Sequence, residues 1–341
     1  MTVRILTGDA LEGLRTLEAG SAQACVTSPP YWGQRDYGVA GQIGAEPSPE
    51  EFVEKLVAVF AEVRRVLHPR GTLWLNLGDC YANNARGPGG DDKRTLTNHG
   101  NWQGTANPPG RQKPWRGGEL KKKDLVGLPW RVAFALQADG WWLRSCIIWA
   151  KPNGMPESVT DRPTTSHEYV FLLTKAERYL YNAEAIKSPA KPDSSARNGR
   201  GRSEAIHHPG QLEHKGLLAK RDKQRGHGRR RAGFNDRWDA MTREEQLALG
   251  ANARTVWTIS PACYKGAHFA VMPEELAARC IRAGTNEGHL VIDPFGGAGT
   301  VGLVAQRLFR HATLIELNPA FVSLAAGRIR ADQPLLADVQ A

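Results

Sequence analysis

Two short stretches of the sequence combine residue types that could do chemistry, and the first is the proline turn Ser28-Pro29-Pro30-Tyr31. Because Pro30 has no amide hydrogen, it cannot draw the Pro29 carbonyl into a regular strand ladder. The Ser28 hydroxyl offers a second acceptor, and the Tyr31 ring offers a surface for stacking. This arrangement could hold the NH₂ group of a planar ligand, although a proline-aromatic turn taken alone is more often structural.

The second stretch is the glycine turn Asp293-Pro294-Phe295-Gly296-Gly297-Ala298-Gly299-Thr300, which follows an apolar run and opens a helical pattern. Glycines let a backbone pass close to a ligand at the carboxyl ends of strands, where doubly wound sheets bind cofactors. The turn departs from G-x-G-x-x-G and lacks the lysine of a phosphate loop, which disfavours pyrophosphate and triphosphate. The carboxylates of Asp293 and Glu316 suit a cationic amino group and a ribose. The pattern favours S-adenosylmethionine, with a nicotinamide cofactor and a structural tight turn as alternatives.

Together, the two turns resemble motifs of the DNA amino-methyltransferases, the family that methylates cytosine N4 or adenine N6. In that family a (D/N/S)-P-P-(Y/F/W) motif is the catalytic loop and a D-x-F-x-G-x-G turn holds the methyl donor. The catalytic motif comes first in this chain, as in the permuted β group. Other family-like stretches are spread over most of the sequence: Gly8-Asp9-Ala10-Leu11, Val66–Thr72, Asn76–Asp79, Trp149–Asn153, Arg162–Thr164 and Tyr264–Ala270.

The resemblance implies an α/β fold of the Rossmann-like, S-adenosylmethionine-dependent methyltransferase type, with a circularly permuted motif order and basic loop insertions. It implies catalytic roles for Ser28, Pro29, Pro30 and Tyr31, with the target base flipped out of the duplex and stacked on Tyr31. The residues expected at the donor are Asp9, Ala10, His268, Phe269, Asp293, Pro294, Phe295, Gly296, Gly297, Gly299, Thr300, Glu316 and Asn318.

The first position of the proline motif bears on the base. Within the family, serine there is commoner in N4-cytosine enzymes and aspartate is usual in N6-adenine enzymes. Since Ser28 holds this position, we expect cytosine N4 methylation, with adenine N6 methylation by the same mechanism as the alternative.

Other activities fit the sequence less well. A cytosine-C5 enzyme needs a nucleophilic cysteine after a proline in its catalytic loop, whereas Cys25 lies in the predicted strand before Thr27. A non-catalytic nucleic-acid-binding protein on a methyltransferase scaffold would not need both motifs intact. Methylation of RNA or of a protein glutamine is a further alternative, but two large basic insertions fit a DNA duplex better than either of these substrates.

The elements that must position these residues follow from hydrophobic periodicity. Predicted strands are Ala24–Thr27, Thr72–Leu77, Leu143–Trp149, Glu168–Thr174, Leu290–Ile292 and Ala312–Leu317. Predicted helices are 49–67, 129–139, 273–283 and 300–308, and Pro69-Arg70-Gly71 is expected to end the first of them. The last strands and helix form a βαβ unit, which suits a parallel sheet.

The charge of the chain is concentrated in two segments with few aliphatic residues. The net charge is +10, and segment 187–254 holds 16 Lys and Arg against 8 Asp and Glu, while segment 81–123 holds 9 against 3. A basic surface is the usual footprint of a polyanion, so we expect double-stranded DNA as the partner. The residues expected to contact it are Lys121, Lys122, Lys123, Arg225, Arg229, Arg230 and Arg231.

These segments set the expected domain organisation. One α/β domain would have a catalytic half, 1–80 with 124–186, and a cofactor-binding half, 255–330. Segment 81–123 would be a basic flexible loop insertion, 187–254 a target-recognition region and 331–341 a C-terminal tail.

Further expectations concern the protein's surroundings. The absence of a long apolar run or a leader segment predicts a cytoplasmic protein without membrane contact, and five scattered cysteines without C-x-x-C spacing predict no metal site. A cognate restriction endonuclease on a separate chain and a homodimer are further partners to consider.

Overall fold

The computed structural model describes residues 1–33, 39–82, 120–121, 123–154, 156–188, 241–242, 244–245, 250–262, 271–332 and 338–341. The chain divides into two compact units, one of residues 1–185 with 254–341 and one of residues 186–253. In the second unit, Ser188 and Ala251 pair in an isolated antiparallel bridge. The site described below lies within the first unit.

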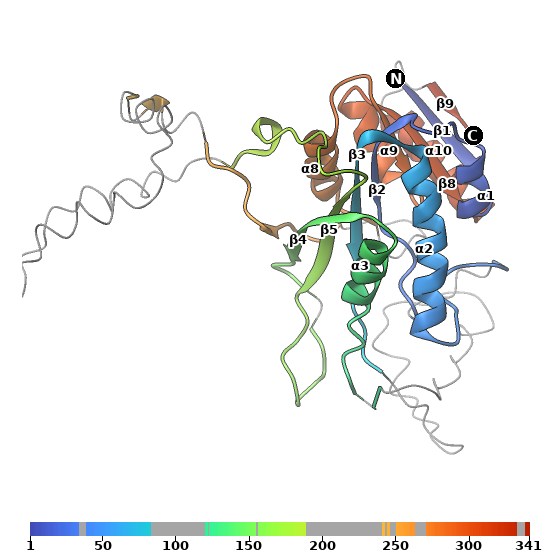
Figure 1. Ribbon diagram of the computed structural model, residues 1–341, viewed down its shortest axis with the longest axis vertical. Coiled ribbons are helices and arrows are strands. Elements are labelled where there is room, and N and C mark those ends of the chain that lie inside the picture. Colours follow the sequence, from blue (N-terminus) through green and yellow to red (C-terminus); the bar gives the residue numbers. More distant parts are fainter. Residues whose placement is uncertain are drawn as a thin grey trace, which may run out of the picture. The chain divides into compact units, whose positions relative to one another are not determined.

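Among its described residues, the first unit is built on a nine-stranded sheet in the order β6-β4-β5-β3-β2-β7-β8-β1-β9 (Figure 1). β5 runs antiparallel to both of its neighbours, β3 and β4, and the other pairs are parallel. The strands are β1 Thr2–Thr7, β2 Ala22–Thr27, β3 Leu67–Leu77, β4 Trp142–Ala150, β5 His167–Thr174, β6 Val256–Thr258, β7 Leu290–Asp293, β8 His311–Glu316 and β9 Asp338–Gln340.

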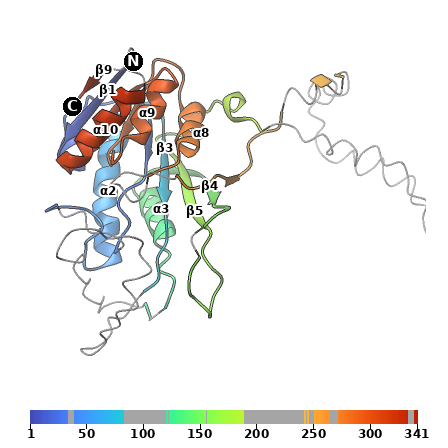
Figure 2. The same cartoon turned by 180° about the vertical axis from the view of Figure 1, so that it is seen from behind.

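Helices cover both faces of this sheet. α1 (Ala10–Arg15), α2 (Pro49–Val66) and α3 (Leu128–Ala138) lie on one face, and α8 (Glu274–Gly284), α9 (Thr300–Arg307) and α10 (Pro319–Asp332) lie on the other (Figures 1 and 2). Strand β2 is buried along its whole length because helices cover it on both sides. Continuous burial is typical of a central strand in a three-layer α/β fold.

The neighbouring strands β2 and β7 mark a point where the winding of the sheet changes direction. They are parallel, with Ala24 paired to Val291 and Cys25 to Ile292. β2 continues into α2 on one face, whereas β7 continues into α9 on the other. The loops that leave β2 and β7 therefore run to opposite faces of the sheet. In open α/β sheets, a crevice that can hold a ligand forms between such loops at the carboxyl ends of the strands.

The six predicted strands and four predicted helices are present. Pro69-Arg70-Gly71, expected as the turn that ends the first helix, lies instead inside β3, which begins directly after α2 ends at Val66. The pairing of β3 with β2 shifts register between Ala22 and Ala24, and this irregularity accommodates the proline and glycine. Gly71 is required there, because a Cβ would lie 2.9 Å from the His68 carbonyl oxygen.

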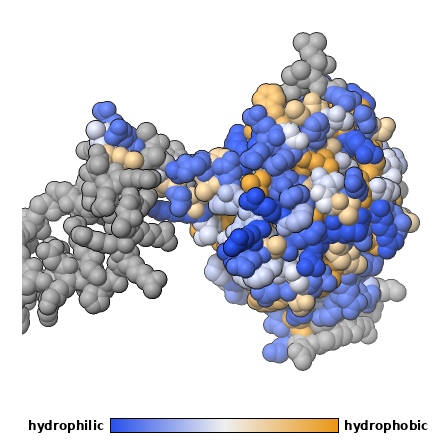
Figure 3. All heavy atoms as spheres, turned by 45° about the horizontal axis from the view of Figure 1, so that its top comes forward, coloured by the Kyte–Doolittle hydropathy of each residue, from blue (hydrophilic) through white to orange (hydrophobic). Residues whose placement is uncertain are grey.

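Six further elements of the described residues were not foreseen from the sequence: β1, α1, the 3-10 helix η2 (Glu184–Ile186), β6, α10 and β9. Residues 331–341, expected to be a tail, contribute the end of α10 and the edge strand β9, which pairs with β1. None of the helices in the described part of the chain has the length and apolar character that crossing a membrane requires. Hydrophilic residues cover much of the face seen in Figure 3, with apolar residues scattered among them.

Candidate active site

A pocket of about 1010 Å³ opens at the carboxyl ends of the parallel strands. Both predicted turns line it: the proline turn follows β2, and the glycine turn follows β7. The ends of β1, β3, β4 and β8 and the beginning of the antiparallel β5 also contribute residues. This volume is at the upper end of the ~300–1,000 Å³ typical of small-ligand pockets, so it could take two planar groups side by side.

Backbone conformation explains the glycines of the second turn. Gly297 and Gly299 have φ values of 49° and 75°, the left-handed region that glycine adopts without strain. A Cβ on Gly299 would also lie 2.8 Å from the Cβ of Ala325 in α10. The turn therefore packs tightly against its own domain and presents its backbone to the pocket.

Glu316 ends β8 and holds the glycine turn from the side. Its two oxygens accept hydrogen bonds from the amides of Gly297 (2.8 Å) and Asn318 (2.9 Å). Burial raises the pKa of this carboxyl group, and the amide hydrogen bonds oppose that rise. Each carboxylate oxygen can accept a second hydrogen bond, so Glu316 is able to bind a pair of neighbouring hydroxyl groups.

Asp293 ends β7 at the bottom of the pocket and is only 4% exposed. Its Oδ1 accepts hydrogen bonds from the Thr27 hydroxyl (2.6 Å) and the Phe295 amide (3.0 Å). Burial raises the pKa of Asp293 to about 7, and the nearby charge of Glu316 adds to this effect. An anionic ligand here would meet two carboxylates, whereas a cationic group would be stabilised.

Asp9 and Ala10 line the same part of the pocket, where β1 ends beside β8. The Asp9 carboxylate caps α1 by accepting from the amides of Leu11 (2.8 Å) and Glu12 (3.1 Å). Capping fixes the start of the helix, so the order of this loop depends on Asp9 whether or not it touches a ligand. Among the described donor candidates, Asp9, Ala10, Asp293–Gly297, Thr300, Glu316 and Asn318 line the pocket, while Gly299 packs behind the turn.

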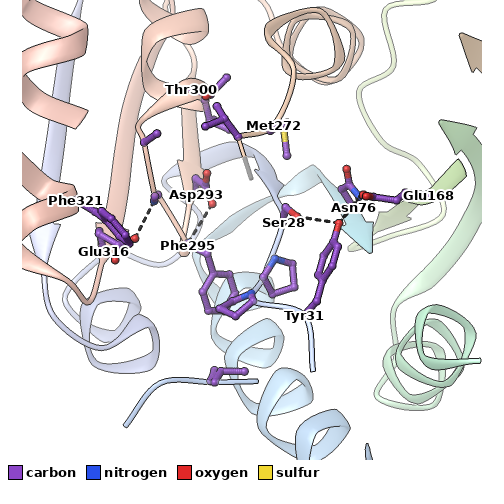
Figure 4. A pocket seen from close by; sticks show the side chains of 18 of the residues that line it. Ser28, Tyr31, Asn76, Glu168, Met272, Asp293, Phe295, Thr300, Glu316 and Phe321 are labelled. Atoms are coloured by element: carbon purple, nitrogen blue, oxygen red, sulfur yellow. Dashed lines mark hydrogen bonds between the residues drawn. The ribbon is translucent and has the colours of Figure 1, made fainter. Parts of the chain in front are cut away.

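The proline turn lies across the pocket from Glu316, and Tyr31 points away from the glycine turn (Figure 4). The Tyr31 hydroxyl donates to Glu168 Oε2 at 2.5 Å and accepts from the Asn76 amide at 3.0 Å. Ser28 Oγ donates to the same hydroxyl at 3.4 Å. Ser28 and the Tyr31 ring are thus brought to one wall of the pocket.

Three polar residues at this wall were not singled out by sequence reasoning: Asn76, Lys151 and Glu168. They come from the end of β3, the residue after β4 and the beginning of β5. Asn76 and Lys151 lie in stretches that resemble the family, but only the antiparallel pairing of β5 with β3 and β4 shows that Glu168 meets them. The sequence signal that could have pointed to these residues is that each of the three predicted strands has a polar residue at one end.

The predicted DNA contacts are only partly within the described residues. Lys123 pairs with Asp161 at 2.5 Å on the exposed surface, and the Lys121 amide donates to Asp124. Neither lysine lines the pocket. The other DNA-contact candidates lie outside the described residues: Lys122, Arg225, Arg229, Arg230 and Arg231. The donor candidates His268 and Phe269 also lie outside them.

Sequence comparison relates the chain to known methyltransferases. Residues 22–327 match the model of the N6/N4 methyltransferase family, described as DNA methylase. The type II methyltransferase M.Cfr9I of Citrobacter freundii is 42% identical over 331 residues, which cover 96% of this chain and 88% of that protein. M.SmaI of Serratia marcescens is 42% identical over 326 residues, covering 96% of this chain and 90% of that protein.

Solved structures share the fold. TTHA0409, a putative DNA modification methylase from Thermus thermophilus complexed with S-adenosyl-L-methionine, has a TM-score of 0.54 at 23% identity, with 100% of both chains covered. PvuII DNA methyltransferase, which is cytosine-N4-specific, has a TM-score of 0.57 at 16% identity, with 100% of this chain and 95% of that chain covered. The Rossmann-like methyltransferase fold expected from the two motifs is confirmed.

Proposed function

The chain belongs to the DNA methylase family of N6- and N4-methyltransferases, and from this we propose that it transfers a methyl group from S-adenosylmethionine to cytosine N4 in duplex DNA. The observation that carries the proposal is that a single pocket is lined by both turns, with Ser28 and Pro29 on one wall and Asp293 and Glu316 on the other. One wall offers acceptors for an amino group, and the other offers carboxylates for a cationic nucleoside.

The donor-binding half of the proposal follows from the two carboxylates. Glu316 would accept hydrogen bonds from the ribose hydroxyls, for which its half-buried carboxylate is already oriented by the Gly297 and Asn318 amides. Asp293 would attract the positively charged amino-acid end of the donor. The backbone of the glycine turn would pass close to the donor at Gly297, where no Cβ intervenes. Gly296 lets the turn lie against β8, because a Cβ there would lie 3.0 Å from the Cβ of Leu314.

The acceptor half of the proposal needs no covalent intermediate. An exocyclic amino group is a weak nucleophile because its lone pair is delocalised into the ring. Ser28 and the Pro29 carbonyl would accept hydrogen bonds from that NH₂ group and orient its lone pair, and Tyr31 would stack on the flipped base. The donor, when bound, would supply an electrophilic methyl group on its sulfonium. The N–C bond would form as the C–S bond breaks, which leaves the donor as a neutral thioether, and the amino nitrogen would release one proton to solvent.

The choice of cytosine rests on Ser28. Serine at this position is commoner in the N4-cytosine members of the family, and the fold itself accommodates that reaction in the cytosine-N4-specific PvuII enzyme. Adenine N6 methylation uses the same acceptors and is the second candidate. A neutral hydroxyl in place of a carboxylate is the feature that favours cytosine.

Duplex DNA is proposed as the substrate because the family acts on DNA and because the two basic segments suit phosphate contacts. Because relatives such as M.Cfr9I come from bacteria, whose DNA lies in the cytoplasm, we propose that the protein acts there. A restriction endonuclease that cuts the same sequence would be the natural functional partner, because the methyltransferases that are similar to this chain include type II enzymes. A homodimer would present two such pockets.

The experiment is transfer of labelled methyl groups from S-adenosylmethionine to unmethylated genomic DNA, which offers a large set of sequences. We expect label in duplex DNA, little in RNA, and none with Tyr31→Ala. Donor binding measured in parallel separates the two halves of the site. A protein that binds the donor but labels RNA or protein, or nothing, would contradict the proposed substrate.

A further inference from the structure

Glu168 occupies a special place at the wall of the pocket. It is the second residue of the antiparallel strand β5 and pairs with Trp149 of β4. Its side chain is 15% exposed. One oxygen, Oε2, accepts hydrogen bonds from the Tyr31 hydroxyl at 2.5 Å and the Asn76 amide at 2.7 Å, and the other oxygen pairs with the Lys151 ammonium group. Three elements of the pocket wall therefore meet at one carboxylate.

Lys151 is held in place from two sides. Its ammonium nitrogen lies 4.6 Å from the ring centroid of Trp149, a cation–π distance, and it is ion-paired with Glu168. The Trp149 indole is itself fixed, because its N–H donates to the Ile259 carbonyl at 2.8 Å. The positive charge is thus fixed beside the carboxylate, which offsets the cost of placing Glu168 in a half-enclosed pocket.

Tyr31 is confined at its ring as well as at its hydroxyl. A Cβ on Gly78 would lie 2.7 Å from Tyr31 Cε2, so the ring fills the space that a larger residue would need. At the other end, Gly44 approaches the Tyr31 backbone, and a Cβ there would lie 3.2 Å from the Tyr31 carbonyl oxygen. With its hydroxyl bound to Glu168, the side chain is held at both ends.

We propose that Glu168 is a positioning residue: it holds Tyr31 by the hydroxyl, and thereby sets the aromatic platform and the Ser28 acceptor before DNA binds. This deepens the proposed function and rests on it. A stacking ring that is already oriented does not have to be ordered when the base arrives, so more of the binding free energy remains for unstacking that base. Glu168 would contact neither the donor nor the methyl group.

A merely structural role predicts something different. Glu168 could stabilise the sheet through Lys151 alone, in which case its effect would not depend on the Tyr31 hydroxyl. The two roles are separated by a double-mutant cycle that combines Glu168→Gln with Tyr31→Phe. Phenylalanine keeps the ring and removes only the hydroxyl. Glutamine has a single acceptor oxygen, which cannot bind Tyr31 and Asn76 on one side and Lys151 on the other.

The cycle is measured on the full-length protein in two ways. Single-turnover methyl transfer to saturating genomic DNA gives the rate of the chemical step. Thermal unfolding of the donor-free protein gives the interaction free energy between Glu168 and the Tyr31 hydroxyl, and this measurement does not require activity. Glu275→Gln is the matched control, because Glu275 pairs with Arg279 on the exposed side of α8 and does not line the pocket. We expect this control to have the wild-type rate.

The proposal predicts that Glu168→Gln and Tyr31→Phe each slow transfer by about 100-fold, as expected for misplacement near the reacting atoms, and that the double variant is no slower. Donor affinity stays at the wild-type value in all three variants. Two results would contradict the proposal that Glu168 holds Tyr31. One is a transfer rate of the double variant that falls by the product of the two single effects, and the other is a loss of unfolding free energy equal to the sum of the two single losses. If the wild-type protein transfers no methyl group to DNA, the proposed function fails, and the unfolding cycle alone then decides whether Glu168 holds Tyr31.

Discussion

The Thr27 hydroxyl donates to Asp293 Oδ1 across 2.6 Å, and this bond joins the last residue of β2 to the last residue of β7. Thr27 immediately precedes the proline turn, and Asp293 begins the glycine turn. Both side chains are buried, with exposures of 0% and 4%. One hydrogen bond therefore couples the part of the pocket proposed for the base to the part proposed for the donor.

Replacing Thr27 by valine tests this link. The shape of the side chain is kept, but Asp293 loses a hydrogen bond that lowers its pKa, so the neutral form is favoured further. We expect donor affinity at pH 7 to fall roughly tenfold, the equivalent of about 1.4 kcal/mol for one lost bond to a charged group. Calorimetric titration with S-adenosylmethionine measures this. Thr313→Val, at a buried position of β8 outside the pocket, is the control and should bind normally.

The raised pKa of Asp293 predicts a pH dependence with a definite sign. The pKa of Asp293 is about 7 in the folded protein, against 3.8 for an unperturbed aspartate. Between pH 3.8 and 7, Asp293 therefore retains its proton in the donor-free protein. Its contribution to stability is present below pH 3.8 and is lost as the pH rises through about 7. A cationic donor favours the ionised form, so binding below pH 7 should release a proton and strengthen as the pH rises.

Titrations at pH 6 in two buffers of different ionisation enthalpy measure that proton release. Asp293→Asn should abolish it and weaken donor binding most above pH 7, where Asp293 of the wild-type protein is ionised. An unchanged proton release in the asparagine variant would assign the proton to another group.

Glu316 is expected to recognise the ribose. Glu316→Gln keeps one acceptor oxygen and replaces the other by an amide, which conflicts with the Gly297 or Asn318 N–H and leaves one hydroxyl unsatisfied. Competition binding with adenosine and 2′-deoxyadenosine measures the effect. The wild-type protein should prefer adenosine by roughly tenfold, the value of one good hydrogen bond to a carboxylate, and the variant should not. Equal preference in both proteins would rule out this role.

Gly78→Ala should disturb the site without touching the donor. The added Cβ would lie 2.7 Å from Tyr31 Cε2, so the ring has to move. We expect the chemical rate to fall by about 100-fold while donor affinity is unchanged, because a shift of about 1 Å near the reacting atoms has that effect. Gly327→Ala in α10 is the control for the cost of the substitution itself, since Gly327 does not line the pocket and a Cβ there meets nothing within 4 Å. Wild-type activity in Gly78→Ala would show that the ring position is not critical.

The motifs and the parallel part of the fold could be predicted from the sequence because both are local. Apolar runs mark β2, β7 and β8, and prolines or glycines mark the turns that follow β2 and β7. The short or half-exposed strands β1 and β9 carry weaker periodicity and depend on long-range pairing, of β1 with β8 and of β9 with β1. Such pairing is not encoded in a local pattern.

The Glu168 network shows the same limit within the site. Glu168 lies 137 residues from Tyr31 along the chain, and their contact depends on β5 entering the sheet antiparallel beside β3. Strand periodicity predicts that β5 exists but not the direction in which it runs. The side chain that meets the proline turn was therefore outside the reach of sequence reasoning, although its strand was not.

Identification of the methylated nucleoside tests the central claim most directly. Genomic DNA incubated with the protein and S-adenosylmethionine is digested to nucleosides, which are separated and identified by mass spectrometry, with Tyr31→Ala as the control. The account predicts N4-methylcytosine that is absent from the control. N6-methyladenine would contradict the base assignment while leaving the pocket and donor intact, and 5-methylcytosine or no methylated base would contradict the proposed chemistry of the proline turn.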